Sequence, residues 1–364
     1  MIQKLRLRHV RIFEKKEIRF FPGINVLLGK NGAGKTSILE AIYLLNFSKS
    51  FKASRDEDIL QIGRDYFQID SEWEHARYRK AAVNYVKERG KRFIYDGVVI
   101  PRVSDVIGSF PMVLQSPEDF RISAGAGSER RLYFDRFISQ ISPPYLRDLM
   151  HFRKLLKNRN ACLKNQSEKK KYHYSEELEI YDQQMSPLMF RILQMRKKAV
   201  SAFNRELCRL YRESFNDGSH AEIRYTASLD AEDEKEFARI HRETARKNSD
   251  KEVALRRSLF GPNYDKYTFF RRDIPLINFA SQGEHKIWLT MLKLAEGEIL
   301  KQRSGEEPLY LFDDLFAELD LANSRRTVER IMEKRQALIS TTDLNDLRRH
   351  GIDSAQSKIH IIEI

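Results

Sequence analysis

The chain has 364 residues, and its 65 Lys and Arg against 52 Asp and Glu give a formal net charge of +13. With 41% hydrophobic and 11% aromatic residues it can bury a sizeable core, and its length suits about two domains. Two distant cysteines exclude a disulfide framework and a thiolate zinc site, while the lack of long apolar runs and of a signal-peptide core predicts a soluble, cytoplasmic protein with no membrane partner.

The first hundred residues predict β-structure around one helix. Two-residue alternation near Leu5 and Ile18 predicts a half-buried hairpin, and the apolar run over residues 24–28 predicts a buried strand. Apolar residues at helical spacing predict a helix over residues 37–45. Residues 66–100, with glycine turns inside, predict a small antiparallel meander.

Beyond Ser142-Pro143-Pro144 the pattern changes to long helices. Basic residues concentrate over residues 145–172, where nine of them against two acidic residues give a net charge of +7. The nine are Arg147, Arg153, Lys154, Lys157, Arg159, Lys164, Lys169, Lys170 and Lys171. This local field favours a polyanionic partner, and the alternative is a solvated helix face.

A heptad stripe follows, and it predicts the packing seam of a helix pair rather than a cofactor site. Its members are Leu178, Tyr181, Met185, Leu188, Ile192, Met195, Ala199 and Ala202. Pro187 is expected to kink or restart this helix. Another helix is predicted over residues 231–259, ended by Gly261-Pro262, so the middle third reads as a helical insertion.

The C-terminal part returns to alternating helices and strands. The pattern predicts helices over residues 283–300 and 321–334. It predicts strands over residues 309–312, 337–340 and 359–364.

A phosphate-binding motif lies between the predicted buried strand and the first predicted helix. Residues 29–36 fit the P-loop pattern G-x-x-x-x-G-K-[ST], whose glycines let backbone N–H groups surround phosphate oxygens at a helix N-terminus. Lys35 is expected to contact the β- and γ-phosphates, and the Thr36 hydroxyl to bind Mg²⁺. The predicted ATP-binding residues are Gly29, Lys30, Asn31, Gly32, Ala33, Gly34, Lys35, Thr36 and Ser37.

The strand over residues 309–312 delivers two carboxylates to one loop. Asp313 is expected to hold Mg²⁺ through its water shell, and Asp314 to polarise the attacking water. The alternative is that the two aspartates cap the following helix. A P-loop in the same chain favours the catalytic interpretation.

Two further motifs surround this acidic pair. Ser281-Gln282-Gly283-Glu284 opens a predicted helix before it, and Ala317-Glu318-Leu319-Asp320 follows it. Together they resemble the signature motif, Walker B motif and D-loop of ABC-type ATPases, in which each signature motif reaches the γ-phosphate on the partner head's P-loop. Thr36 and Ser281 are 245 residues apart, which points to the SMC-like branch with its helical insertion.

Within that branch the chain resembles the RecF family of bacterial DNA replication and repair ATPases from end to end. The resemblance rests on residues 29–37, 49–52, 116–119, 130–135, 155–161, 281–283 and 311–320. It implies an α/β fold: an ABC-type ATPase head, with a P-loop mixed sheet and an antiparallel β subdomain, interrupted by a helical arm lobe with a short coiled coil. The predicted parts are residues 1–142 and 263–364 for the head and 143–262 for the arm.

The chain departs from the family's usual sequence at two places. It reads Gly261-Pro262-Asn263-Tyr264-Asp265-Lys266 where the family usually has Gly-Pro-His-Arg-Asp-Asp, and Glu284 stands where Gln is common. Asp314 occupies the position where transporter-like heads carry a glutamate. A shorter carboxylate holds water less closely, so we expect slow, switch-like ATP hydrolysis.

The resemblance and the charge pattern suggest further site residues. Gln115 is a candidate catalytic residue in the loop that senses the γ-phosphate and Mg²⁺, and Arg11 is a candidate to stack on the adenine. Asp320 would be the D-loop residue, and Thr341 and Thr342 would form the switch. The candidate DNA contacts are Lys49, Lys52, Arg55, Lys154, Lys157 and Arg159.

The resemblance implies that ATP drives homodimerisation of heads that clamp duplex DNA next to single-strand gaps. The dimer would help RecO and RecR load recombinase, and no motif for sequence-specific readout is present. One alternative is an ATP-gated structural interaction module that does not bind DNA directly. A nuclease-linked ATPase would need a further metal-carboxylate domain, for which too few residues follow Asp320.

Overall fold

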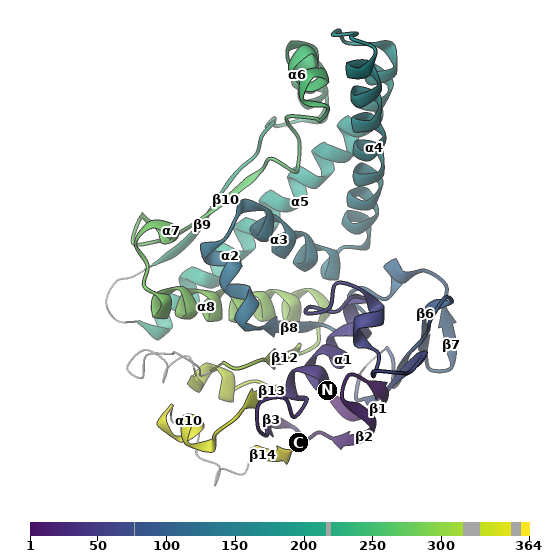
Figure 1. Cartoon of the computed structure of the whole chain (residues 1–364). Helices are drawn as coiled ribbons and strands as arrows, with labels where there is room; N and C mark the ends of the chain where they lie inside the picture. The colour runs from purple at the N-terminus through teal and green to yellow at the C-terminus, as the bar shows by residue number, and fades with distance from the viewer. Residues whose placement is uncertain (76, 216–219, 316–327, 351–357) are drawn as a thin grey trace. The chain divides into compact units, whose positions relative to one another are not determined.

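The computed structural model describes residues 1–75, 77–215, 220–315, 328–350 and 358–364 (Figure 1). Two compact units make up the chain. The first comprises Met1–Ala124, Glu206–Ala221 and Leu276–Ile364, and the second comprises Gly125–Arg205 and Glu222–Pro275.

The first unit contains a five-stranded sheet in which every neighbouring pair is parallel. In order across the sheet, its strands are β14 (Ile359–Glu363), β3 (Gly23–Leu28), β13 (Gln336–Thr341), β12 (Leu309–Phe312) and β8 (Met112–Gln115). Every residue of β8, β12 and β13 is buried, as continuous apolar runs in a covered parallel sheet require. The carboxyl ends of all five strands therefore meet at one edge.

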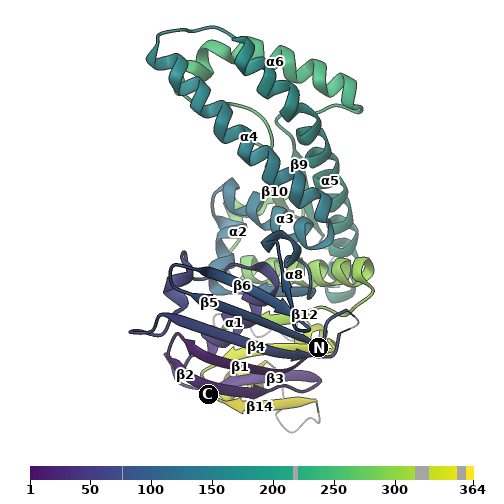
Figure 2. The ribbon, with the colours of Figure 1, turned by 90° about the vertical axis from the view of Figure 1, so that its right-hand side faces the viewer.

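A six-stranded antiparallel sheet completes the β-structure of this unit. Its order is β2 (Phe13–Arg19), β1 (Ile2–Val10), β4 (Tyr66–Trp73), β5 (Lys80–Val86), β6 (Gly90–Tyr95) and β7 (Val98–Ile100). The predicted hairpin and the predicted meander are confirmed, and β1 joins them by pairing with β4 (Figure 2). Along β4 buried and half-buried residues alternate strictly, so one face belongs to the core.

Helix α1 (Lys35–Phe47) contacts both sheets, through β1 and β5 on one side and β8 and β13 on the other. Residues 38–46 are all buried, as expected for a helix that is apolar around most of its circumference. Helix α8 (Gln282–Ser304) contacts β8, and its Gly297 leaves no room for a side chain because a Cβ there would lie 1.8 Å from the Tyr310 hydroxyl. These contacts hold both helices against the sheet edge that carries the site.

The second unit is mainly helical. Its helices are α3 (Gly127–Ile141), α4 (Pro143–Glu168), most of α5 (Glu176–Ser214) and α6 (Glu234–Leu255). It also contains a sheet that the sequence did not predict, in the order β11 (Ile274–Pro275), β10 (Lys266–Arg271) and β9 (Ala221–Thr226). The predicted division at residues 142 and 262 stays a prediction. Helix α3, which comes before residue 142, packs against α4 and β10 and belongs to the second unit.

The structure corrects two details of the helical prediction. Of the kink or restart expected at Pro187, the restart does not occur, because α5 continues through this residue; Met185, Leu188 and Ile192 of the predicted stripe are buried. Helix α6 ends at Leu255, before the predicted Gly261-Pro262 stop. Its C-cap residue Arg256 adopts a left-handed conformation with φ 56°, which ends the helical hydrogen bonding there.

The remaining described elements are short. They are the 3-10 turns η1 (Asp56–Ile59), η2 (Val103–Asp105) and η3 (Pro117–Asp119), and the helices α2 (Phe120–Ala124), α7 (Leu276–Phe279) and α10 (Leu344–Arg349). The helix predicted over residues 321–334 falls partly outside the described residues, and residues 328–332 are helical. Among the helices described, none has the length and apolar character of a membrane span.

Candidate nucleotide-binding site

The predicted site forms where parallel strands end. Strand β3 leads into the P-loop, β12 leads into Asp313 and Asp314, and β13 ends at Thr341. Ligands of open α/β sheets bind outside the carboxyl ends of the strands, so the topology alone puts the P-loop and the acidic pair at the expected edge.

The P-loop turns into α1 through a glycine that cannot be replaced without strain. Gly34 has φ 97°, and a Cβ at this position would lie 2.4 Å from Cζ of Phe13. The Lys35 ammonium donates hydrogen bonds to the carbonyls of Gly29 at 2.6 Å and Lys30 at 3.0 Å. Lys35 therefore lies over its own loop, where a phosphate would be bound.

Asp313 is held by hydroxyl groups from two other segments. The Thr36 hydroxyl donates to its carboxylate and lies 3.0 Å from each oxygen. The Ser340 hydroxyl donates to Asp313 Oδ1 at 2.7 Å and accepts a hydrogen bond from the Asp314 backbone N–H at 2.9 Å. Asp314 itself has φ 53°, a conformation that residues with a Cβ adopt rarely.

These oxygen atoms suit Mg²⁺, which prefers hard carboxylate and hydroxyl ligands. In the described part of the chain no group of three or more His, Cys, Asp or Glu side chains forms a metal site by itself. Thr36 and Asp313 would hold Mg²⁺ together with phosphate oxygens of a nucleotide, which is how the ion is commonly bound in phosphoryl-transfer sites.

One cavity of about 620 Å³ brings most of the predicted residues together. Its walls include Arg11, Asn31, Gly32, Gly34, Lys35, Thr36, Ser37, Lys52, Asp313, Asp314, Ser340, Thr341 and Thr342. Lys52, predicted as a DNA contact, thus lines the P-loop cavity.

Arg11 is fixed at the wall of this cavity by a carboxylate that the sequence interpretation missed. Its guanidinium donates to both oxygens of Glu40, at 2.9 and 2.8 Å, and Ser50 also hydrogen-bonds Glu40. These hydrogen bonds raise the pKa of Arg11 above its ordinary value, although burial lowers it. Glu40 is 1% exposed, and a lone charge inside the apolar run over residues 38–45 was the signal that could have found it.

Gln115 lies close to the acidic pair but outside the P-loop cavity. It lines a second cavity of about 340 Å³, whose walls include Gln282, Asp313 and Asp314. Its side-chain amide donates to the Thr290 hydroxyl of α8 at 3.0 Å, and its Oε1 has no hydrogen-bond partner among the described residues.

Ser281 is the N-cap residue of α8, and its hydroxyl accepts a hydrogen bond from the Glu284 N–H. The Glu284 carboxylate accepts from the Ser281 N–H at 2.9 Å, so this departure from the family sequence completes a capping box, which takes Glu as well as Gln. Ser281 is exposed and lines neither of the two cavities. Asp320, predicted as the D-loop residue, lies outside the described residues.

The two residues predicted to form the switch differ in their surroundings. The Thr341 hydroxyl is buried and hydrogen-bonds the backbone of Asp343, while Thr342 is exposed. Of the DNA candidates, Lys49, Lys52, Arg55, Lys154 and Lys157 are exposed.

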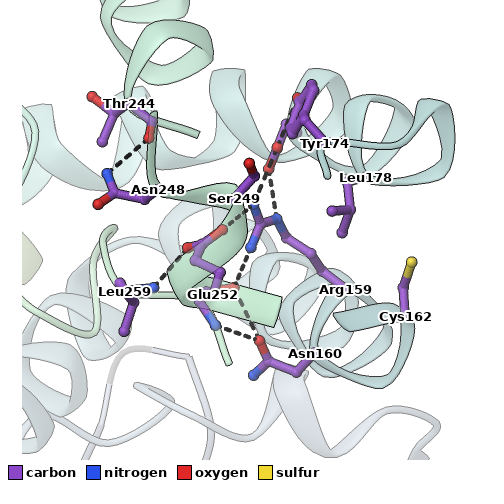
Figure 3. Close-up of polar contacts among 12 residues, drawn as sticks. Arg159, Asn160, Cys162, Tyr174, Leu178, Thr244, Asn248, Ser249, Glu252 and Leu259 are labelled. Carbon is purple, nitrogen blue, oxygen red and sulfur yellow. Dashed lines mark hydrogen bonds and ion pairs between the residues drawn. The ribbon is translucent and has the colours of Figure 1, made fainter. Parts of the chain in front are cut away.

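Arg159 cannot be a DNA contact, and this prediction was wrong. The side chain is 1% exposed and lies among helices α4, α5 and α6 (Figure 3). It binds Asp182 and Glu252, each at 2.7 Å, and the Ser258 hydroxyl at 2.7 Å. Burial lowers the pKa of Arg159, but these two carboxylates raise it above its ordinary value, so the arginine stays charged as a structural ion-pair centre.

Comparison with known proteins agrees with this geometry. The family described as AAA domain matches residues 4–350. The DNA replication and repair protein RecF of Streptococcus equi subsp. zooepidemicus (strain H70) is 30% identical over 360 residues, covering 99% of this chain and 96% of the relative. The same protein of Geobacillus thermodenitrificans (strain NG80-2) is 28% identical over 357 residues, covering 97% and 96%.

Solved structures show the same fold. The recombination mediator protein RecF–ATPrS in the RecFOR pathway has a TM-score of 0.88 at 25% identity, covering 100% of this chain and 96% of that chain. An Smc head bound to the winged-helix domain of ScpA has a TM-score of 0.53 at 16% identity, covering 96% and 91%. The predicted fold class, an ABC-type head with a helical insertion, is confirmed.

Proposed function

The chain belongs to the RecF family of DNA replication and repair proteins. We propose that it is an ATPase in which ATP binding and hydrolysis control the binding and release of DNA. The contact between Thr36 and Asp313 carries the proposal, because it joins the P-loop to the acidic pair inside one cavity. ATP with Mg²⁺ is the ligand that this combination suits.

In the proposed reaction, groups of this chain bind the nucleotide phosphates, hold the metal ion and polarise the attacking water. The P-loop N–H groups and Lys35 would bind the phosphates, while Thr36 and Asp313 would hold the Mg²⁺ ion. Mg²⁺, when bound, supplies charge stabilisation at the phosphate oxygens. Asp314 accepts a hydrogen bond from the attacking water, and because its side chain is short the hydrolysis is slow and suits a switch.

We propose that ATP joins two copies of the chain. Ser281 is exposed and lies outside the P-loop cavity of its own chain, as a residue that serves a partner's nucleotide would. The N-terminus of α8 would then meet the γ-phosphate of the second copy, where its partial positive charge favours an anion.

The proposed DNA contact lies on α4, along an exposed basic row that is defined by Arg147, Lys154, Lys157 and Lys164. At 1.5 Å per residue the row extends about 26 Å, so it can follow several phosphates of a duplex. Flexible cations of this kind position DNA without reading its sequence. A duplex beside a single-strand gap, with RecO and RecR as partners in loading recombinase, is the proposed setting.

Sedimentation of the chain with and without ATP and gapped DNA tests this function. ATP should convert monomer to dimer, and gapped DNA should join the dimer and leave after hydrolysis. An ATP-dependent dimer that does not bind DNA at low salt would favour the alternative function, an ATP-gated interaction module. A monomer under all conditions would overturn the proposal.

A further inference from the structure

We propose that Ser340 is a positioning residue for both carboxylates of the acidic pair. The inference rests on the proposed magnesium-dependent ATP hydrolysis, and it concerns a residue that the motif pattern did not single out. Ser340 lies in β13, next to the strand that delivers Asp313.

The register of the two strands brings these residues side by side. Phe312 of β12 pairs with Ile339 of β13 in a parallel register, so Asp313 and Ser340 are the next residues on neighbouring strands. Ser340 is 2% exposed, which protects its hydrogen bonds from competition by water.

A serine hydroxyl has one proton, and in Ser340 both the acceptor of this proton and the donor to the hydroxyl oxygen are defined. The proton goes to Asp313 Oδ1 at 2.7 Å, and the oxygen accepts from the Asp314 N–H at 2.9 Å. A single atom therefore binds the side chain of one carboxylate residue and the backbone of the other.

For Asp313, Ser340 supplies the orientation that Thr36 does not. The Thr36 hydroxyl lies 3.0 Å from both carboxylate oxygens, whereas Ser340 bonds only Oδ1. Thr36 is also an expected metal ligand, and it would bind the ion through an oxygen lone pair while its proton stays on Asp313. Ser340 bonds a single oxygen and is therefore the donor that defines the rotation of the Asp313 carboxylate.

For Asp314, Ser340 holds a disfavoured backbone. The φ of 53° directs the side chain of Asp314, and this left-handed conformation costs free energy even for Asp, which tolerates it better than most residues with a Cβ. The hydrogen bond from its N–H to Ser340 helps to offset that cost. Loss of the hydroxyl should therefore disturb metal binding and water activation together.

The test is the variant Ser340→Ala, which is compared with the wild type in three measurements. The first is how the binding of a fluorescent ATP analogue depends on the Mg²⁺ concentration. The others are Mn²⁺ binding by electron paramagnetic resonance with ATP present, and the rate of ATP hydrolysis. We expect the Mg²⁺ concentration for half-maximal effect to rise on the order of tenfold, with analogue affinity in EDTA unchanged. Ser340→Thr, which keeps the hydroxyl, should stay within about threefold of the wild type.

Ser71→Ala is the matched control, because Ser71 is also buried, donates to the Ala81 carbonyl and accepts from Trp73 Nε1. It should leave the Mg²⁺ dependence unchanged. If Ser340→Ala does not fold, Ser340→Cys, with a weak donor of similar size, takes its place. Wild-type Mg²⁺ dependence in the variant, or an equal loss in EDTA, would overturn the inference. A wild-type chain without magnesium-dependent hydrolysis would instead overturn the proposed function.

Discussion

Thr36 and Asp313 lie 277 residues apart in the chain, yet the Thr36 hydroxyl is 3.0 Å from both oxygens of the Asp313 carboxylate. Parallel pairing of β3, β13 and β12 produces this contact, because it aligns the ends of strands from distant segments. The P-loop and the acidic pair are thus parts of one site.

Replacing Asp314 by Asn should separate binding from hydrolysis. Asn tolerates the left-handed backbone of this position and keeps the shape of the side chain, but it is a poor acceptor for the proton of water. We expect hydrolysis to fall on the order of 10² or more, with ATP affinity within about threefold of the wild type. Phosphate release and equilibrium binding measure the two quantities. Equal losses in both would contradict the assigned role.

Ser281→Arg should abolish ATP-dependent dimerisation and leave ATP binding intact, because in the proposed dimer this exposed N-cap residue would contact the nucleotide of the second copy. Lys35→Arg should abolish dimerisation by weakening the phosphate contact itself. Ser304→Arg, the same change at the exposed far end of α8, is the control. Sedimentation in the presence of ATP measures the dimer fraction of each of the three variants. Loss of ATP binding by the Ser281→Arg monomer would show that the trans assignment is wrong.

The basic row on α4 should control the salt dependence of DNA binding. Replacing Lys154 and Lys157 by Gln removes two proposed phosphate contacts, so the slope of log affinity against log salt should become shallower by about 2. Fluorescence anisotropy with gapped DNA between low and moderate salt measures it. An unchanged slope would show that Lys154 and Lys157 of α4 do not contact DNA phosphates.

Arg159→Met should act on stability instead of DNA binding. Removing the guanidinium leaves the carboxylates of Asp182 and Glu252 buried without their cation, which should cost about 3–5 kcal/mol in the free energy of unfolding. Urea unfolding measures this cost. Lys157→Met, two residues away and exposed, should change the free energy by less than about 0.5 kcal/mol. A reduced salt slope for folded Arg159→Met would contradict this assignment.

Stability of the second unit should fall in mild acid because of His241, which is 1% exposed. Burial lowers its pKa to about 4 from an ordinary value of 6.5, with Asp182 opposing and Arg159 assisting the shift. Only the unfolded chain binds a proton between these values, so this contribution is complete above pH 6.5 and is lost as the pH falls toward 4, by about 3 kcal/mol in all.

Urea unfolding midpoints measured between pH 4 and pH 7 test whether stability falls as the pH is lowered. His241→Leu should flatten the pH dependence by one proton, whereas His151→Leu on the exposed face of α4 should not. A profile unchanged by His241→Leu would mean that another group is responsible.

The fold was predictable where local patterns and fixed motifs agree. The P-loop, the acidic pair and the antiparallel meander follow from glycine spacing, apolar runs and alternation. The sheet formed by β9, β10 and β11 did not follow, because helix α6 separates β9 from β10 in the chain and β11 has only two residues. Its pairing depends on tertiary contacts that no local pattern records.

Arg159 shows why the charge pattern misled. Phe152, Leu155, Arg159, Cys162 and Gln166 follow the 3,4 spacing of a buried helix face, and all five are buried. Counting charge along residues 145–172 ignored this periodicity. Ser340 was missed for a different reason, since its role depends on the register between β12 and β13, which motif spacing does not define.

The strand order of the parallel sheet has a consequence for synthesis. Strand β3 is the first strand of this sheet in chain order, and it pairs on one side with β13 and on the other with β14, so both of its edges stay unpaired until residues 336–363 are made. A nascent chain therefore exposes an apolar strand to chaperones, and to aggregation, until those residues have been synthesised. Competence to bind nucleotide is expected to arise late, and all at once, when the last strands insert.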